Sequence, residues 1–169
     1  MAQYKIFNGP MPTTAKFAKV ATGTSIKTML QVKASSTVGF HIVEWGISFD
    51  GASAVTPGTV ELIQTDVAAT VTASAAADII KYDAAALMGG DQTTNLIPVG
   101  TTSTGYTSSG EGSITAIRLF DVQQLPPTAP YVMQFPLGHR PFVEIAKFAR
   151  VRVHMGTDVN VICYMLIEV

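Results

Sequence analysis

Hydrophobic and polar residues alternate along most of the chain. The stretch HIVEWGISFDG (41–51) places Trp45 and Phe49 on one face and Glu44 on the other. Alternation with a period of two is typical of a strand with one buried face, and the β-branched and aromatic content favours a sheet. We therefore predict a strand that ends at Asp50-Gly51 and expect Trp45 and Phe49 to lie in the core. The same pattern recurs in three further segments: 25–34, 59–65 and 149–155.

Shorter strand patterns follow at 114–125, 131–138 and 140–146, with proline and glycine between them. The Gly/Ser/Thr-rich stretch 100–113 predicts an exposed loop. Asp83 is a candidate N-cap for one short helix, which Gly89-Gly90 would end. About eight short strands with little helix predict an all-β, antiparallel jelly-roll sandwich or barrel. An immunoglobulin-like sandwich is the second choice.

The last predicted strand, 159–169, is apolar on both faces. A strand of this kind is covered by a second layer or by another subunit. We expect a central strand in a subunit contact, and the candidate contact residues on its second face are Ile162, Tyr164 and Leu166.

The first 19 residues contain Pro10 and Pro12, which suit an extended chain without ladder hydrogen bonds. We therefore predict that residues 1–19 form a contact arm, with an edge strand as the alternative, and that residues 20–169 form a single domain. The candidate contact residues of the arm are Tyr4, Ile6, Phe7 and Phe17.

Composition narrows the classes of partner. The 169 residues suit one domain, and with 47% hydrophobic residues, 14% charged residues and a net charge of −1 we expect much of the surface to contact other protein. There is no basic excess for nucleic acid, and the apolar stretches are too short to span a membrane. The N-terminus lacks the apolar segment of a signal peptide, so we expect synthesis in a cytoplasm.

Candidate chemistry is sparse. His41, His139 and His154 are far apart in the sequence. Alternation puts His41 and Glu44 on opposite faces of one strand, so this stretch does not match the metal-binding motif of cupins. Cys163, the single cysteine, lies in the most apolar strand, where we expect a core residue and no nucleophile. Acids such as Glu44 do not stand out from others on a wet strand face. We expect no enzyme activity, no metal and no cofactor.

Several segments in this order resemble one family: ATGTSIKTMLQVKA, VEWGISFDG, TVELIQTD, TGYT with GEG, RLFDVQQL, PLG, and RVRV followed by CYMLIEV. They are similar to the jelly-roll decoration, or cement, proteins of tailed bacteriophage capsids. The resemblance implies a homotrimer on the capsid surface, bound to the major capsid protein and stabilising the assembled shell. Two alternatives stay open: a carbohydrate- or receptor-binding module of a virion, with an exposed aromatic platform, and a cupin-like enzyme.

Overall fold

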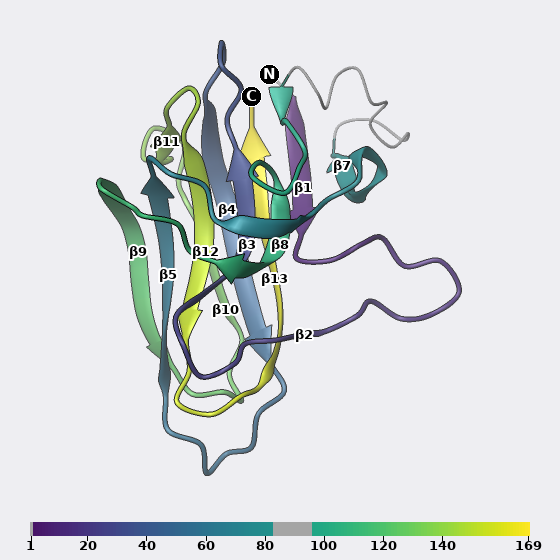
Figure 1. Ribbon diagram of the computed structural model, residues 1–169, viewed down its shortest axis with the longest axis vertical. Coiled ribbons are helices and arrows are strands. Elements are labelled where there is room, and N and C mark those ends of the chain that lie inside the picture. Colours follow the sequence, from purple (N-terminus) through teal and green to yellow (C-terminus); the bar gives the residue numbers. More distant parts are fainter. Residues whose placement is uncertain (1, 83–95) are drawn as a thin grey trace.

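The computed structural model describes residues 2–82 and 96–169. Within them the chain forms two antiparallel β-sheets that pack face to face as a sandwich, with both termini at the same end (Figure 1). The predicted all-β sandwich is confirmed. The helix expected after Asp83 lies outside the described residues.

The first sheet has seven strands. Neighbouring strands follow the order β10 (Tyr131–Gln134), β4 (Phe40–Phe49), β13 (Asn160–Glu168), β1 (Gln3–Phe7) and β7 (Ile79–Lys81). Two short strands join it at the sides, β11 (Phe142–Val143) on β4 and β2 (Val20–Ala21) on β13.

The second sheet has six strands. Their order is β6 (Thr70–Ala73), β8 (Gly105–Gly110), β3 (Lys27–Lys33), β12 (Phe148–His154), β5 (Gly58–Thr65) and β9 (Ile117–Leu125). One turn of 3-10 helix, η1 (Ala76–Asp78), precedes β7.

Eight of these strands have the connectivity of a jelly roll. In chain order they are β1, β3, β4, β5, β9, β10, β12 and β13, and their pairing is nested. The first strand pairs with the last, β3 with β12, β4 with β10, and β5 with β9. This nesting places the strands alternately in two sheets, which is the double Greek key of a jelly roll.

The core lies between the inner faces of the two sheets. Trp45 and Cys163 are fully buried there, as the alternation predicts. Phe49 is partly buried and packs against the same core. Met29, which strict alternation assigns to the other face, is also buried in the core, because the pairing of β3 with β12 shifts register at Met29, between Thr28 and Leu30.

The contact arm predicted for residues 1–19 is wrong for residues 3–7. Gln3–Phe7 is a strand inside the sheet, paired with β13 on one side and β7 on the other. Tyr4 and Ile6 are 1% and 0% exposed, so they belong to the core and are not part of a contact arm. The prolines that suggested an arm, Pro10 and Pro12, come after the chain has left the sheet.

The stretch 100–113 is also more ordered than predicted. It contains β8, which pairs with β3 and β6. Thr104 is fully buried, and its hydroxyl oxygen accepts a hydrogen bond from the backbone N–H of Lys33 at 3.0 Å. Small residues make this close packing feasible: a Cβ on Gly105 would lie 2.3 Å from the Thr72 carbonyl oxygen.

Candidate functional site

The predicted contact residues fall into two groups. Tyr4, Ile6 and Leu166 are buried within the subunit and are not available to a partner. The others are partly buried and lie on the outer face of the sheet, away from the core: Phe7, Phe17, Ile162 and Tyr164.

This outer face is covered in part by the chain itself. The ring of Phe7 lies 5.6 Å from that of Phe17 and 5.7 Å from that of Tyr164, and the Lys5 ammonium group sits 4.0 Å from the centre of the Tyr164 ring. Burial, together with a 2.5 Å hydrogen bond from its hydroxyl to Glu44, raises the pKa of Tyr164. The apolar second face of the last strand is thus largely explained by contacts within one subunit.

A different surface carries most of the exposed apolar side chains. Of the ten large hydrophobic residues that are exposed in the described part of the chain, seven fall between residues 117 and 145. We call this region the edge surface; its apolar residues are Ile117, Leu119, Val122, Val132, Leu137, Phe142 and Ile145. By strand register, Ile117, Leu119 and Val122 lie on the outer face of the second sheet, whereas Val132 and Phe142 lie on the outer face of the first, so the edge surface wraps around the two sheet edges. Exposed apolar side chains that gather in this way favour contact with another molecule.

The topology explains why these residues are exposed together. β9 ends one sheet and β10 ends the other, and in the described residues β9 pairs with β5 alone and β10 with β4 alone. Figure 1 shows β9 and β11 along one side of the sandwich, opposite β1 and β7. An edge strand presents unpaired N–H and C=O groups, and proteins usually protect such edges with lysine or proline. β9 contains neither residue; its protection is limited to a register irregularity between Leu119 and Asp121 and to the inward-pointing carboxylate of Asp121.

A carboxylate joins the two sheets behind this edge. Asp121 on β9 accepts hydrogen bonds from the indole N–H of Trp45 at 3.1 Å and from the Tyr131 hydroxyl at 2.9 Å. The rings of Trp45 and Tyr131 lie 5.4 Å apart. Burial, then the bond to Asp121, raises the pKa of Tyr131 to about 12. Since Trp45 is fully buried, it cannot be the exposed platform of a sugar site.

The edge surface holds one exposed ion pair. Arg118 on β9 lies 3.2 Å from the Glu144 carboxylate, and the same guanidinium donates to the carbonyl oxygen of Phe142 at 3.2 Å. The two side chains are 49% and 52% exposed. This pair ties the start of β9 to the segment after β11 and leaves the surface without net charge.

The outer face of the second sheet contains a buried arginine that the sequence pattern assigns to a wet face. Arg150 on β12 is fully buried and donates to the carbonyl oxygens of Val67 and Glu111 and, at 3.3 Å, to the Glu111 carboxylate. Burial lowers the pKa of Arg150, and the Glu111 charge counteracts this shift. The same carboxylate accepts the N–H and the hydroxyl of Thr28, each at 2.6 Å.

These bonds fix two segments, 66–75 and 99–112, across the sheet. Gln31 contributes by binding the N–H and carbonyl groups of Ala69 and the carbonyl of Ser103. We call the two segments the covering segments. Their contacts are structural, because the polar groups named here bond to one another within the protein; the exception is the Nε of Arg150, which is buried without a hydrogen-bond partner.

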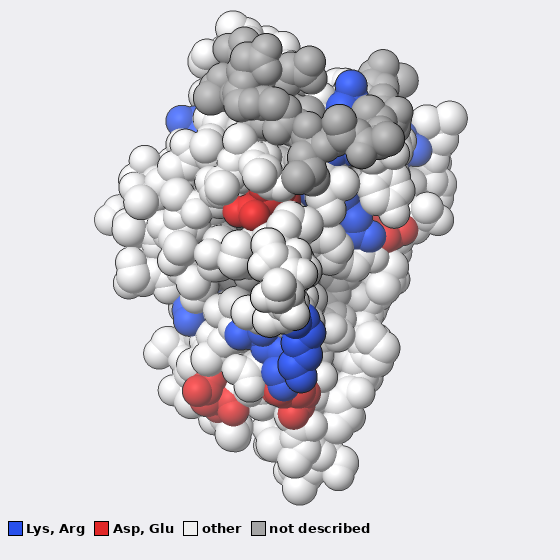
Figure 2. Space-filling model, turned by 90° about the vertical axis from the view of Figure 1, so that its right-hand side faces the viewer, with Lys and Arg blue, Asp and Glu red and all other residues white. Residues whose placement is uncertain are grey.

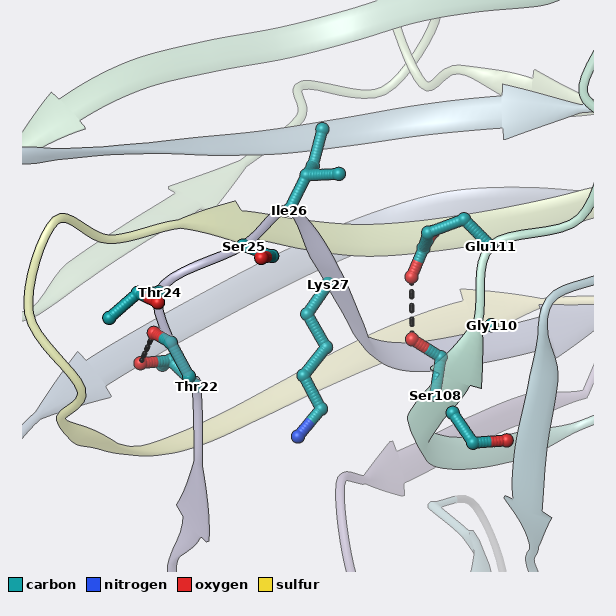
Figure 3. A pocket seen from close by; sticks show the side chains of 10 residues that line it. Thr22, Thr24, Ser25, Ile26, Lys27, Ser108, Gly110 and Glu111 are labelled. Atoms are coloured by element: carbon teal, nitrogen blue, oxygen red, sulfur yellow. Dashed lines mark hydrogen bonds between the residues drawn. The ribbon is translucent and has the colours of Figure 1, made fainter.

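A hollow beside the covering segments has a volume of about 370 Å³. Figure 3 shows one wall formed by residues 22–26 and the other by residues 108–111, with the Lys27 side chain between them. The ammonium group of Lys27 donates to the Ala21 carbonyl at 2.9 Å, and Ser108 donates to Glu111 at 2.5 Å. The charged groups of this hollow are therefore engaged within the subunit.

Metal-ligating side chains are not clustered within residues 2–82 and 96–169. No three His, Cys, Asp or Glu side chains there are grouped to hold a metal ion. Burial raises the pKa of the Cys163 thiol, which disfavours the reactive thiolate. In the same residues no helix is long and apolar enough to cross a membrane. The side with β1 and β7 shows small groups of both charges and no continuous basic patch (Figure 2).

No protein-family model, no curated protein and no solved structure matches the chain. The edge surface is thus identified from the geometry of this chain alone, and it is the candidate functional site.

Proposed function

We propose that the protein is a structural virion protein that decorates an assembled bacteriophage capsid and stabilises it, without catalytic activity. The observation that carries the proposal is the edge surface, where exposed apolar side chains gather along two sheet edges. A surface with these exposed apolar side chains favours another protein as its binding partner. The sequence resemblance to capsid decoration proteins supplies the kind of partner, the major capsid protein.

The body of the molecule suits this role. A decoration protein has to keep its shape while it bears load between neighbouring coat subunits. Here the two sheets pack around a core with a buried tryptophan, the Asp121 carboxylate joins them, and a buried arginine holds the covering segments on the second sheet.

Binding to the shell stabilises it by linkage. A ligand that binds only the assembled state lowers the free energy of that state by RT ln(1 + [L]/Kd) for each site. Repetition over many equivalent sites, and a trimer with three contacts at each, increase the apparent affinity through multivalency. We accordingly propose a homotrimer at the capsid surface, with the protein made in the host cytoplasm.

Co-sedimentation with purified shells tests the proposal. Shells that lack the protein are mixed with increasing amounts of it, and the pelleted amount is measured beside free coat subunits. We expect saturable binding to assembled shells, weak binding to free coat subunits, and a higher temperature of shell disruption at saturation. Binding that is absent, or equal for free and assembled coat protein, would contradict the proposal.

A further inference from the structure

One row of side chains crosses the outer face of the first sheet near the end where both termini lie. Strand pairing places Phe142 of β11 beside His41 of β4. It also places Glu168 of β13 between His41 and Gln3 of β1. Each of the four residues is followed or preceded on its strand by a core residue, so the row points away from the core. Figure 1 shows β11 and the last residues of β13 at this end of the sandwich.

Arg140, just before β11, contacts this row and closes a small hollow over it. Its guanidinium Nη1 donates to the Glu168 carboxylate at 2.5 Å, and the two side chains are 18% and 11% exposed. Together with His41, Leu137 and Gly138 they line a hollow of about 260 Å³. Pockets for drug-sized ligands begin at about 300 Å³, so this hollow suits a smaller group.

The protein itself makes little use of the Arg140 guanidinium. Within the described residues this group forms one hydrogen bond, and its Nε is buried without a partner. The other two arginines with little exposure, Arg150 and Arg152, each donate hydrogen bonds from two nitrogens. Buried polar groups are normally paired. The unused donors of Arg140, beside a hollow, therefore indicate a bound group that carries acceptors.

The hollow also offers acceptors. Besides the bond from Arg140, the Glu168 carboxylate receives only a weak one from the Gln3 amide, at 3.4 Å, so lone pairs remain for a ligand. The Nδ1 of His41 lies 3.4 Å from the carbonyl oxygen of Arg140, which can only accept. This contact places a proton on Nδ1 and leaves Nε2 of the neutral ring as an acceptor. Donors and acceptors thus lie side by side, and the Arg140–Glu168 pair carries no net charge.

We propose that this hollow binds one ring of a neutral sugar. A hydroxyl group both donates and accepts, so neighbouring hydroxyls of one ring can accept from Arg140 and donate to Glu168. Ions fit less well, because a bound anion would lie next to the Glu168 carboxylate and a bound cation next to the guanidinium. Leu137, whose side chain is 81% exposed, supplies an apolar wall for the C–H face of the ring.

A hollow of this size binds a single ring weakly, with a Kd of about 1 mM. Many copies on one particle would raise the apparent affinity for a glycan-covered surface through multivalency. That consequence rests on the proposed function, whereas the site itself rests on the hollow alone.

An NMR titration of the isotope-labelled protein tests the site. The probes are the methyl glycosides of glucose, galactose and mannose, and the chemical shifts of the amides that line the hollow are followed. Acetate and phosphate serve as anionic probes, and N-methylacetamide represents a peptide group.

The variants are Arg140→Gln, Glu168→Gln and Leu137→Ser. The matched control is Glu61→Gln, because Glu61 forms a similar partly buried pair with an arginine, at 2.7 Å, on the other sheet. Melting temperature checks the fold of each variant. Leu137→Ser keeps the test informative if a variant of the ion pair fails to fold, since the Leu137 side chain lies outside the core.

We expect at least one glycoside to shift these amides in a saturable manner, with a Kd of about 1 mM. Arg140→Gln and Glu168→Gln should weaken binding about tenfold or more, because each removes a charged hydrogen-bond partner of the sugar. Leu137→Ser should weaken binding about threefold at an unchanged melting temperature. Glu61→Gln should bind as the wild type does.

Three results would overturn the inference. The first is that none of the glycosides shifts the amides of the hollow. The second is that acetate, phosphate or N-methylacetamide binds there in preference to all three glycosides, which would assign the hollow to an anion or a peptide. The third is that folded Leu137→Ser binds the sugar as strongly as the wild type does. Each of these results leaves co-sedimentation with shells, and so the proposed function, unaffected.

Discussion

Removing the Glu111 carboxylate is expected to destabilise the protein strongly. In Glu111→Ala the Arg150 guanidinium, whose side chain is 0% exposed, keeps two carbonyl oxygens and loses the carboxylate with which it forms an ion pair. Leaving a buried charge without its partner costs about 3–5 kcal/mol of unfolding free energy. The loss of the acceptor for Thr28 acts in the same direction.

The double variant Arg150→Met/Glu111→Gln is expected to cost less than Glu111→Ala, although it changes two residues. No charge stays buried in it, and an apolar side chain of similar length replaces the arginine. A control on the same sheet is Glu61→Ala, whose partner Arg152 is 13% exposed and can reach water. We expect about 1 kcal/mol for that variant.

Urea unfolding, followed by Trp45 fluorescence, measures these free energies. Hydrogen exchange adds a local readout: in Glu111→Ala the amides of the covering segments, 66–75 and 99–112, should exchange faster while β4 and β13 stay protected. A loss below about 1 kcal/mol for Glu111→Ala, or a double variant less stable than it, would refute the role we assign to the carboxylate.

The remaining predictions concern the core and the N-terminal strand. Trp45→Ala should lower the unfolding free energy by about 3–5 kcal/mol, measured by urea denaturation. Deletion of residues 1–12 removes β1 and should leave the protein unfolded or insoluble, as circular dichroism would reveal. The pKa of Tyr131 is raised to about 12, so the unfolded chain releases that proton first and stability should fall between pH 10 and 12; Tyr131→Phe should reduce this slope in alkaline denaturation. Cys163 should react with a thiol reagent only after unfolding.

Alternation along the sequence predicted the strands and much of the core because it reflects local geometry. A residue such as Trp45 lies on the inner face whatever strand is its neighbour. Alternation failed at Arg150, because an arginine between Ala149 and Val151 suggests a face exposed to water. Its burial depends on the carbonyl of Val67 and on Glu111, which are 83 and 39 residues away. No local pattern contains that information.

The candidate site could not be predicted for a related reason. Ile117, Leu119 and Val122 belong to an ordinary strand pattern, and they are exposed because they lie on the outer face of β9, the last strand of its sheet. Edge position follows from the nested pairing of the whole chain. Conversely, the sequence pattern placed Tyr4 and Ile6 in a predicted contact arm. They are buried because β13, more than 150 residues later, pairs with β1.

Hydrogen exchange along β9 tests the central claim, that another protein chain covers the edge surface. The purified protein is labelled at concentrations above and below its association, and the peptide that covers 117–125 is compared with one that covers β6, the other edge of the same sheet. We predict that β9 amides become protected as concentration rises while β6 amides do not change. Exchange at β9 that is fast and independent of concentration, both in solution and on shells, would contradict the account.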